Sequence, residues 1–147
     1  MILFKESFGI RAYLEKQQQK GRSIGFVPTM GALHRGHMAL VEASVKNTGL
    51  TVCSIFVNPT QFNDPADFAK YPVTLENDLK LLAENGADIV FLPEVSGIYP
   101  AGKDQFKHYP LGPLETILEG KYRPGHFQGV CQVVHRLLDI VQPDILY

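Results

Sequence analysis

Tryptophan is absent from the sequence, cysteine occurs only twice, and the charges nearly cancel. The scarcity of cysteine and the balance of charge each argue against a class of protein. Cys53 and Cys131 lie far apart in apolar stretches, so we expect two buried free thiols rather than a disulfide framework or a zinc site. The formal net charge is −1 and no run of lysine or arginine stands out, which argues against nucleic acid as the main partner.

Long apolar runs are missing as well. No stretch approaches the roughly 20 residues needed to cross a bilayer. The start, MILFKESFGI, lacks the basic residues and long apolar segment of a signal peptide. We therefore expect a cytoplasmic protein without a membrane partner. The chain is well suited to form a core, because 45% of its 147 residues are hydrophobic and a chain of this size buries about 70% of its unfolded surface.

Helical and strand-like stretches alternate along the chain. We expect helices over residues 7–21, 37–49, 74–86 and 129–143, and strands over 23–27, 51–57, 88–93 and 144–147. Thr74 is expected to cap the third helix, and the stretch 51–57 is typical of a strand buried on both faces. The alternation predicts an α/β fold, a Rossmann-like doubly wound parallel sheet. Because the sequence stops within the first residues of a core strand, we expect a C-terminally truncated, incomplete domain over residues 1–147.

Two polar loops follow two of these strands. PTMGALHRGH follows the strand at 23–27, and NPTQF follows the strand at 51–57. Parallel sheets bind ligands at the carboxyl ends of their strands. We therefore expect the two loops to meet at one edge of the sheet.

The first loop places His34 and His37 three residues apart, with Gly36 between them. If a helix begins near residues 32–34, both histidines lie on one face of its first turn, where free N–H groups attract anions. Gly31 would allow a sharp turn, and Gly36 would leave room for a ligand across the helix end. Such a phosphate site differs from the G-x-x-x-x-G-K-[ST] loop, which is absent. An ordinary turn and a metal site remain open, although a metal would need a third ligand that the neighbouring sequence lacks.

H-x-G-H after a strand is typical of the nucleotidyltransferase superfamily, and the longer string PTMGALHRGH resembles the pantothenate synthetase (pantoate–β-alanine ligase) family. The similarity continues in the family's order through SIFVNPTQF, YPVTLENDL, IYP, LEGKYRPGHFQGVCQVV and IVQPD. Cys131 stands where the family usually has threonine. Family members also continue with a G-x-K-D-x-Q-Q loop, a serine loop with a nearby arginine, and a smaller C-terminal domain. The resemblance thus implies that residues 1–147 are an N-terminal nucleotide- and pantoate-binding domain without the C-terminal domain.

The resemblance also implies a reaction in two steps. ATP and pantoate give pantoyl adenylate and pyrophosphate, and β-alanine then attacks the adenylate to give pantothenate and AMP. Magnesium is expected on the phosphates, and we assign no residue as a metal ligand. A homodimer joined through this domain is expected, with the stretch 51–57 as a candidate part of its interface. Because the later loops are missing, we expect the fragment itself to be inactive.

Site residues follow from the same resemblance. His37 and His34 are expected to be catalytic, as hydrogen-bond donors to phosphate oxygens. ATP is expected to contact a run of eight residues: Met30, Gly31, Ala32, Leu33, His34, Arg35, Gly36 and His37. Pantoate and β-alanine are expected to contact Gln61, Thr29, Met30 and Asn58.

Several positions and functions stay open. Asn58 either orients its loop or touches substrate. Asp78 either serves magnesium or lies on a solvated helix face. Arg123 and His126 either close over the site or form a turn, which we favour. The alternatives to the ligase are another H-x-G-H nucleotidyltransferase, such as a cytidylyltransferase or phosphopantetheine adenylyltransferase, and a non-catalytic nucleotide-binding or dimerisation module.

Overall fold

The fold is built on a sheet of parallel strands. The computed structural model describes residues 1–62, 65–100, 107–117 and 119–147. In this part of the chain five strands pair in the order β1-β4-β3-β2-β5, and every pairing is parallel. The strands are β1 (Ile2–Phe4), β2 (Ile24–Thr29), β3 (Leu50–Ile55), β4 (Ile89–Phe91) and β5 (Ile145–Leu146). The predicted α/β doubly wound sheet is confirmed.

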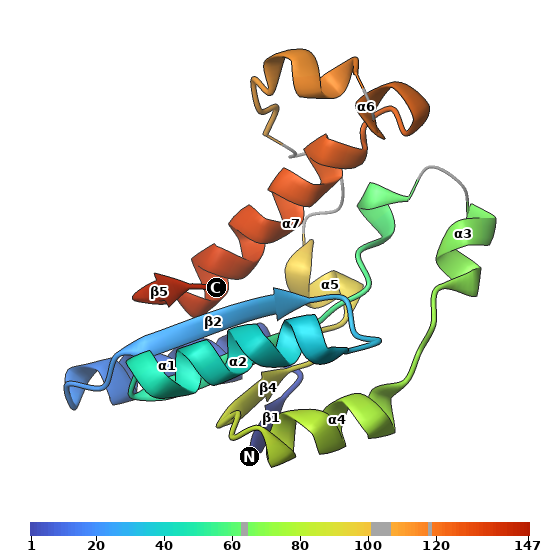
Figure 1. Cartoon of the computed structure of the whole chain (residues 1–147). Helices are drawn as coiled ribbons and strands as arrows, with labels where there is room; N and C mark the ends of the chain where they lie inside the picture. Colours follow the sequence, from blue (N-terminus) through green and yellow to red (C-terminus); the bar gives the residue numbers. More distant parts are fainter. Residues whose placement is uncertain (63–64, 101–106, 118) are drawn as a thin grey trace.

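Four longer helices cover the two faces of the sheet. They are α1 (Ser7–Gln19), α2 (Arg35–Asn47), α4 (Leu75–Glu84) and α7 (His126–Val141). The side chains of α1 and α7 share one buried core with Phe26 of β2, whereas those of α2 and α4 share a second core with Val27 of the same strand. Figure 1 shows α7 and α2 on opposite sides of β2. The alternation of Phe26 and Val27 between the two cores is the side-chain period of a strand buried on both faces.

The central strand β3 is buried along its whole length, as the sequence predicts. Val52 faces the core of α1 and α7, and Cys53 faces the core of α2 and α4. Burial raises the pKa of the Cys53 thiol to about 12, so this cysteine behaves as a small apolar side chain. Both cysteines are free, but the expectation of burial is wrong for Cys131, which is partly exposed on α7.

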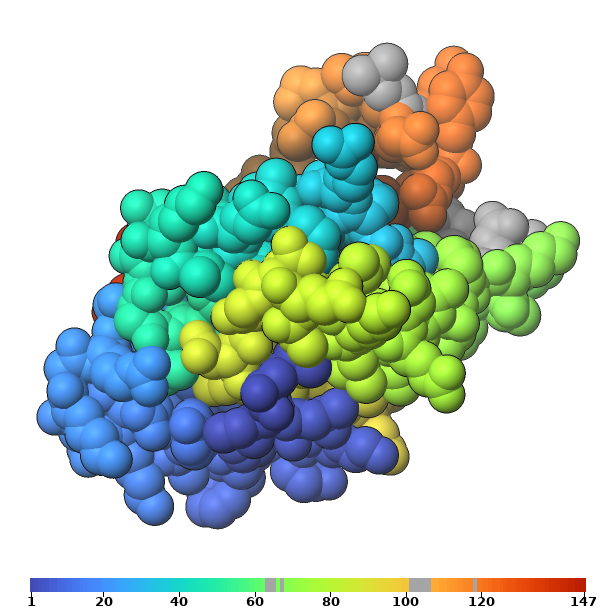
Figure 2. All heavy atoms as spheres, turned by 60° about the horizontal axis from the view of Figure 1, so that its bottom comes forward, coloured from blue at the N-terminus to red at the C-terminus, as the bar shows by residue number. Residues whose placement is uncertain are grey.

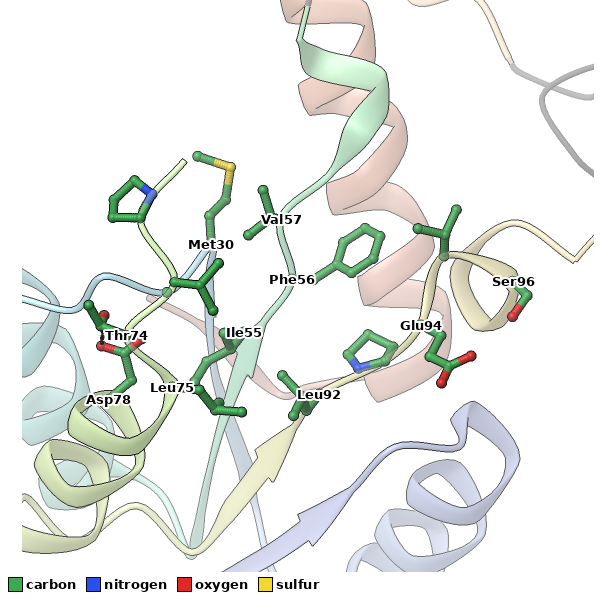
Figure 3. A pocket seen from close by; sticks show the side chains of 15 residues that line it. Met30, Ile55, Phe56, Val57, Thr74, Leu75, Asp78, Leu92, Glu94 and Ser96 are labelled. Atoms are coloured by element: carbon green, nitrogen blue, oxygen red, sulfur yellow. Dashed lines mark hydrogen bonds between the residues drawn. The ribbon is translucent and has the colours of Figure 1, made fainter. Parts of the chain in front are cut away.

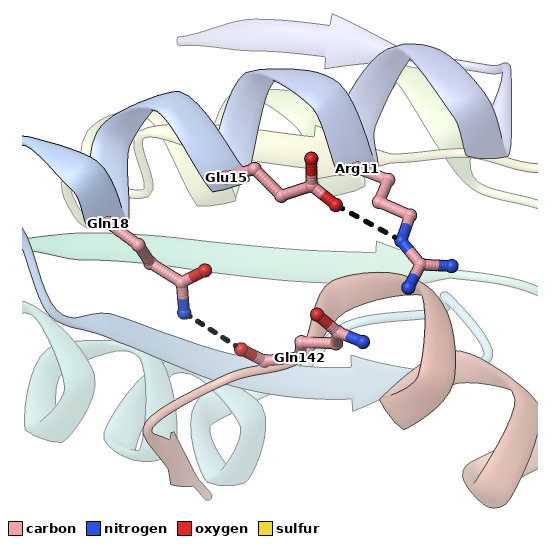
Figure 4. Close-up of polar contacts among 4 residues, drawn as sticks. All are labelled: Arg11, Glu15, Gln18 and Gln142. Atoms are coloured by element: carbon pink, nitrogen blue, oxygen red, sulfur yellow. Dashed lines mark hydrogen bonds and ion pairs between the residues drawn. The ribbon is translucent and has the colours of Figure 1, made fainter.

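The C-terminal ends of α1 and α7 are joined by a side-chain bond. The Gln18 amide donates to the carbonyl oxygen of Gln142 at 3.1 Å, and Gln142 has the left-handed conformation that ends α7 (Figure 4). The ion pair of Arg11 and Glu15 on α1 is exposed and contributes little stability. Asp144 then accepts from the backbone N–H of Ile24 at 2.7 Å, which fixes the start of β5 beside β2.

Shorter elements are not predicted by the sequence. They are β1, α3 (Pro65–Lys70), α5 (Val95–Ile98), α6 (Glu119–Tyr122) and the 3-10 turns η1 (Pro59–Gln61) and η3 (Gly112–Glu115). These six elements have at most six residues, and their sequences show no helical period that would distinguish them from loops. Figure 2 shows α2 and α4 side by side on one face, and Figure 1 shows α6 beyond the start of α7, away from the sheet. None of the helices in the described ranges is long and apolar enough to cross a membrane.

Candidate active site

The histidine turn, residues 29–37, joins β2 to α2. The backbone reverses through Gly31 and Ala32, which both have positive φ angles, 81° and 49°. Glycine adopts this conformation readily, whereas alanine adopts it at a conformational cost that the surroundings must offset. The helix begins at Arg35 with His34 as its N-cap, one residue beyond the predicted range.

The two histidines cap the helix that they begin. His34 Nδ1 accepts from the N–H of Gly36 at 3.1 Å, and His37 Nδ1 accepts from the N–H of His34 at 3.3 Å. The ring centroids are 4.0 Å apart. Because a backbone N–H can only donate, each neutral ring carries its proton on Nε2. Nε2–H is therefore the group that each ring can offer to an anionic ligand.

The environment of His37 favours its neutral form. Partial burial lowers its pKa below the ordinary value of 6.5, and the nearby His34 lowers it further. Asp78 acts in the opposite direction but is the smallest of the three causes. His37 therefore acts at neutral pH as an oriented hydrogen-bond donor rather than as a cation.

Asp78 is hydrogen-bonded to the backbone of the histidine turn. This residue of α4 is buried, with 1% of its surface exposed. Its two oxygens accept the backbone N–H groups of Ala32 and Leu33, each at 2.9 Å. The solvated helix face considered for Asp78 is therefore wrong, and its carboxylate is engaged by the protein. Thr74 is at the predicted N-cap of α4, but its hydroxyl donates to Asp78 at 3.1 Å instead of accepting from the helix.

Gly36 also lies close to the ring of His34. A Cβ atom at this position would lie 3.0 Å from Cε1 of the His34 ring and 3.1 Å from its Nδ1. A side chain here would push the capping ring by a few tenths of an ångström. The expected role of Gly36 in leaving room for a ligand stays a prediction.

The NPTQF loop folds into the turn η1, which is organised by Asn58. Asn58 is fully buried, and its side chain bonds to Thr60, Gln61, Tyr99 and Gly129. These contacts use both the amide hydrogens and the carbonyl oxygen. They favour the loop-orienting role over direct contact with a ligand.

A cavity of about 280 Å³ brings the two loops together. We call it the α7 cavity; it is lined by Pro28, Thr29, Met30, Gly31, His37, Phe56, Gln61, Tyr71, Val130, Val133, Val134 and Leu137. Five predicted site residues share its wall: Thr29, Met30, Gly31, His37 and Gln61. It opens at the carboxyl ends of β2 and β3, where an open α/β sheet binds ligands. Asn58 and His34 are not part of the lining.

Several lining residues of the α7 cavity are not predicted by the sequence to belong to a site. The apolar residues of α7, such as Val133 and Leu137, form one helical face at the spacing typical of core. They do pack in the core, but part of the same face borders the cavity. The periodicity of a helix shows which side is apolar, and it does not show where that side meets a ligand.

A second cavity of about 540 Å³, the β4 cavity, lies on the other side of Met30. It shares Met30, Gly31 and Phe56 with the α7 cavity, and its wall is mostly apolar. Figure 3 shows Asp78 on one side of this cavity and Glu94 on the other. Nothing in the sequence indicates it, because its wall comes from four separate segments.

The start of α7 is fastened to the turn η1. His126 Nδ1 lies 2.8 Å from the carbonyl oxygen of Gln61, which can only accept. The turn that we favoured for this region is present, since Gly125 has a φ angle of 80°. Arg123 forms an ion pair with Glu119 one helical turn away, at 3.9 Å.

Within the described ranges, no three His, Cys, Asp or Glu side chains gather closely enough to hold a metal ion.

Comparisons with known proteins identify a family. The model of the pantoate–β-alanine ligase family matches residues 3–147. A pantothenate synthetase of Bacteroides thetaiotaomicron is 51% identical over 94% of this chain and 48% of its own length. The corresponding protein of Azobacteroides pseudotrichonymphae is 50% identical over the whole chain and 52% of its own length.

Solved structures are similar over the entire chain. The crystal structure of pantothenate synthetase from Thermus thermophilus has a TM-score of 0.89 at 45% identity, and 51% of its chain is covered. The pantoate–β-alanine ligase of Francisella tularensis, complexed with β,γ-ATP and β-alanine, has a TM-score of 0.92 at 42% identity, with 56% covered. The chain thus spans about half the length of the relatives it matches. With the family model matched from residue 3 to residue 147, the chain belongs to the pantoate–β-alanine ligase family.

Proposed function

We propose that residues 1–147 are the nucleotide- and pantoate-binding domain of an enzyme that joins pantoate to β-alanine at the expense of ATP. This proposal rests on the α7 cavity, which is lined by both Gln61 and His37. The two residues come from two sequence motifs that resemble those of the matched family. The family match also decides against a cytidylyltransferase or phosphopantetheine adenylyltransferase.

The reaction needs two displacements. A carboxylate oxygen of pantoate attacks the α-phosphorus of ATP, an O–P bond forms, and pyrophosphate leaves. The amine of β-alanine then attacks the acyl carbon, loses a proton, and expels AMP. The pantoate carboxyl is ionised at pH 7 and needs no base. The barrier comes from bringing two anions together and from the charge that develops on the phosphates, which oriented donors stabilise.

In this proposal the Nε2–H groups of His37 and His34 donate to phosphate oxygens, with His37 nearest the reacting phosphate. Met30, Gly31, Arg35 and Gly36 contribute to the nucleotide site around them. Ala32 and Leu33 belong to the same turn, but their N–H groups bond to Asp78. Those two residues therefore support the shape of the turn rather than donating their N–H groups to phosphate.

Pantoate would occupy the α7 cavity. Gln61 donates to one of its oxygens, while Thr29 and Met30 border it and Asn58 orients Gln61. The valine and leucine side chains of α7 suit the two methyl groups of pantoate, because they present an apolar wall opposite the polar loop. β-Alanine would approach the same cavity after adenylation.

Magnesium is proposed to arrive on the ATP phosphates. Asp78, the nearest buried carboxylate, already accepts two backbone N–H groups and a hydroxyl, so it is not available as a direct ligand. A metal held by phosphates and water agrees with the preference of Mg²⁺ for keeping several waters. The metal would offset phosphate charge.

We also propose a cytoplasmic homodimer. The stretch 51–57 is not a good candidate for the interface, because β3 lies between β2 and β4 and all six of its residues are buried. An edge of the sheet is better suited, since Ile2 and Leu3 of β1 are more than 40% exposed.

The proposed site is tested in a chimera of this chain with the second half of the Thermus thermophilus relative. Gln61→Ala should raise the KM for pantoate at least about tenfold, which corresponds to the loss of one hydrogen bond to a charged group, and should leave the KM for ATP nearly unchanged. Gln19→Ala, at an exposed position of α1, is the matched control. Equal effects on both substrates, or no effect, would remove Gln61 from the pantoate site.

For the 147 residues alone we propose binding without turnover, which an assay of AMP formation checks.

A further inference from the structure

The orientation of the Asn58 amide is fixed by backbone groups. Its Nδ2 lies 3.1 Å from the carbonyl oxygen of Gly129, which can only accept. Its Oδ1 lies 3.3 Å from the N–H of Thr60, which can only donate. A reversed amide would place donor against donor and acceptor against acceptor. The two ends of this buried side chain are therefore unambiguous.

This orientation determines which end of Gln61 faces the cavity. Asn58 Nδ2 also lies 3.2 Å from Gln61 Oε1, so the oxygen of Gln61 points toward Asn58. Gln61 Nε2 then points toward Met30, with the sulfur at 2.8 Å. Thioether sulfur is a weak acceptor. A ligand oxygen that replaced it would make a stronger bond.

Tyr99 completes the series of contacts. It lies at the C-terminal end of α5, and 7% of its surface is exposed. Its hydroxyl donates to Asn58 Oδ1 at 3.0 Å and lies 3.5 Å from the hydroxyl of Thr60. Burial raises the pKa of Tyr99, so the phenol keeps the proton that it donates. The carbonyl end of Asn58 thus receives a side-chain donor from a segment about 40 residues further along the chain.

We propose that Tyr99 is a positioning residue that reinforces, through Asn58 Oδ1, the orientation in which Gln61 presents its NH₂ group to the α7 cavity. The site then selects a ligand with an acceptor at this point, such as a carboxylate or hydroxyl oxygen. The identity of that ligand as pantoate rests on the proposed function, whereas the orientation of the amides does not.

The arrangement has a consequence for specificity. An analogue that carries an ammonium group in place of this acceptor oxygen would set two donors against each other. A site built to bond one polar group discriminates strongly against an analogue that leaves a buried group unpaired. Tyr99 is therefore a determinant of selectivity without touching the ligand.

The test uses the uniformly ¹⁵N-labelled 147-residue chain without ligand. Tyr99→Phe keeps the ring and removes only the hydroxyl. It should speed the exchange of the Gln61 side-chain amide protons with water about fivefold, the effect of losing one hydrogen bond of about 1 kcal/mol. Tyr109→Phe is the matched control, because that hydroxyl bonds to His135 at 2.7 Å and not to Asn58. It should change this rate less than about twofold.

An exchange rate in Tyr99→Phe that matches the Tyr109→Phe control would overturn the proposal. If Tyr99→Phe does not fold, the unmodified chain provides the test. A nuclear Overhauser effect between the Asn58 side-chain amide and Gln61 supports the proposal, and absence of this contact overturns it. A pantoate titration of the same samples is read separately. If the unmodified chain fails to bind pantoate while the amide signals respond as described, the proposed substrate is wrong and the role of Tyr99 stands.

Discussion

His34 and His37 each serve two purposes with one ring. Their Nδ1 atoms bond to the backbone at the start of α2, and their Nε2–H groups remain for a ligand. Helix N-caps are usually serine, threonine, aspartate or asparagine, whose short side chains reach only the backbone. An imidazole reaches the backbone with one nitrogen and leaves a second donor on the far side of the ring. The imidazole side chains and their spacing of three residues therefore fix the orientation of both rings.

The protonation of His37 tests this geometry. Its pKa should lie below 6.5, and His34→Ala should raise it, because one cause of the lowering is then removed. Since the folded chain favours the neutral ring, the resulting stability is present above pH 6.5 and is lost as pH falls through the lowered pKa. Titration of the ring proton signals by NMR measures this directly. A midpoint at or above the ordinary value would contradict the described surroundings of His37.

Asp78 is expected to matter more for stability than any exposed acidic residue. Asp78→Ala leaves the N–H groups of Ala32 and Leu33 without their acceptor, and should lower the free energy of unfolding by about 3 kcal/mol. Glu76→Ala, in the exposed first turn of the same helix, should change it by less than about 0.5 kcal/mol. Urea unfolding measures both. Equal effects would mean that the turn does not depend on Asp78.

At the scale of elements, the contact between α7 and η1 assembles the site. His126 bonds to the carbonyl of Gln61, and Gly129 allows the helix backbone to approach Thr60. A Cβ atom at Gly129 would lie 2.5 Å from the Thr60 carbonyl oxygen and 2.9 Å from Gln61 Cα. The polar side of the α7 cavity is thus held directly against the helix that provides its apolar side.

Two glycine substitutions in helices should therefore have opposite signs. Gly129→Ala should destabilise the chain by about 2 kcal/mol, because the backbone atoms that the new Cβ would meet cannot move aside easily. Gly9→Ala should stabilise it by about 0.5 kcal/mol, since the nearest atom to the added Cβ belongs to Phe4 at 3.6 Å, an ordinary contact distance. Thermal or urea unfolding distinguishes the two. Destabilisation by both changes would show that the close approach at Gly129 is not the cause.

The long helices are predicted from the periodicity of their apolar residues. The strands at 23–27, 51–57, 88–93 and 144–147 are predicted from short apolar runs. The convergence of the two loops follows from the parallel sheet alone. The contacts of Asp78 do not follow from the sequence, because its partners Ala32 and Leu33 lie 46 and 45 residues away along the chain. No local sequence pattern indicates a contact between residues so far apart. The sequence suggests a role for Gly36 in ligand access, and the structure adds that the ring of His34 lies close to it.

For the whole molecule, two neighbouring cavities lie at one edge of the sheet. The α7 cavity contains the polar residues of both loops, and the β4 cavity is mostly apolar; Met30 lies between them. Because the strand order places β2 between β3 and β5, the α7 cavity lies near the point where the order of strands reverses. The fold therefore favours the smaller cavity as the substrate site.

A pantoate titration of the chain with ¹³C-labelled valine and leucine methyl groups tests whether the α7 cavity binds pantoate. We expect millimolar pantoate to shift the methyl signals of Val133, Val134 and Leu137, and Gln61→Ala to abolish these shifts while the spectrum stays that of a folded protein. The Gln19→Ala control should behave like the unmodified chain. Shifts confined to Leu75 and Leu92 of the β4 cavity, or no shifts at all, would contradict pantoate binding in the α7 cavity.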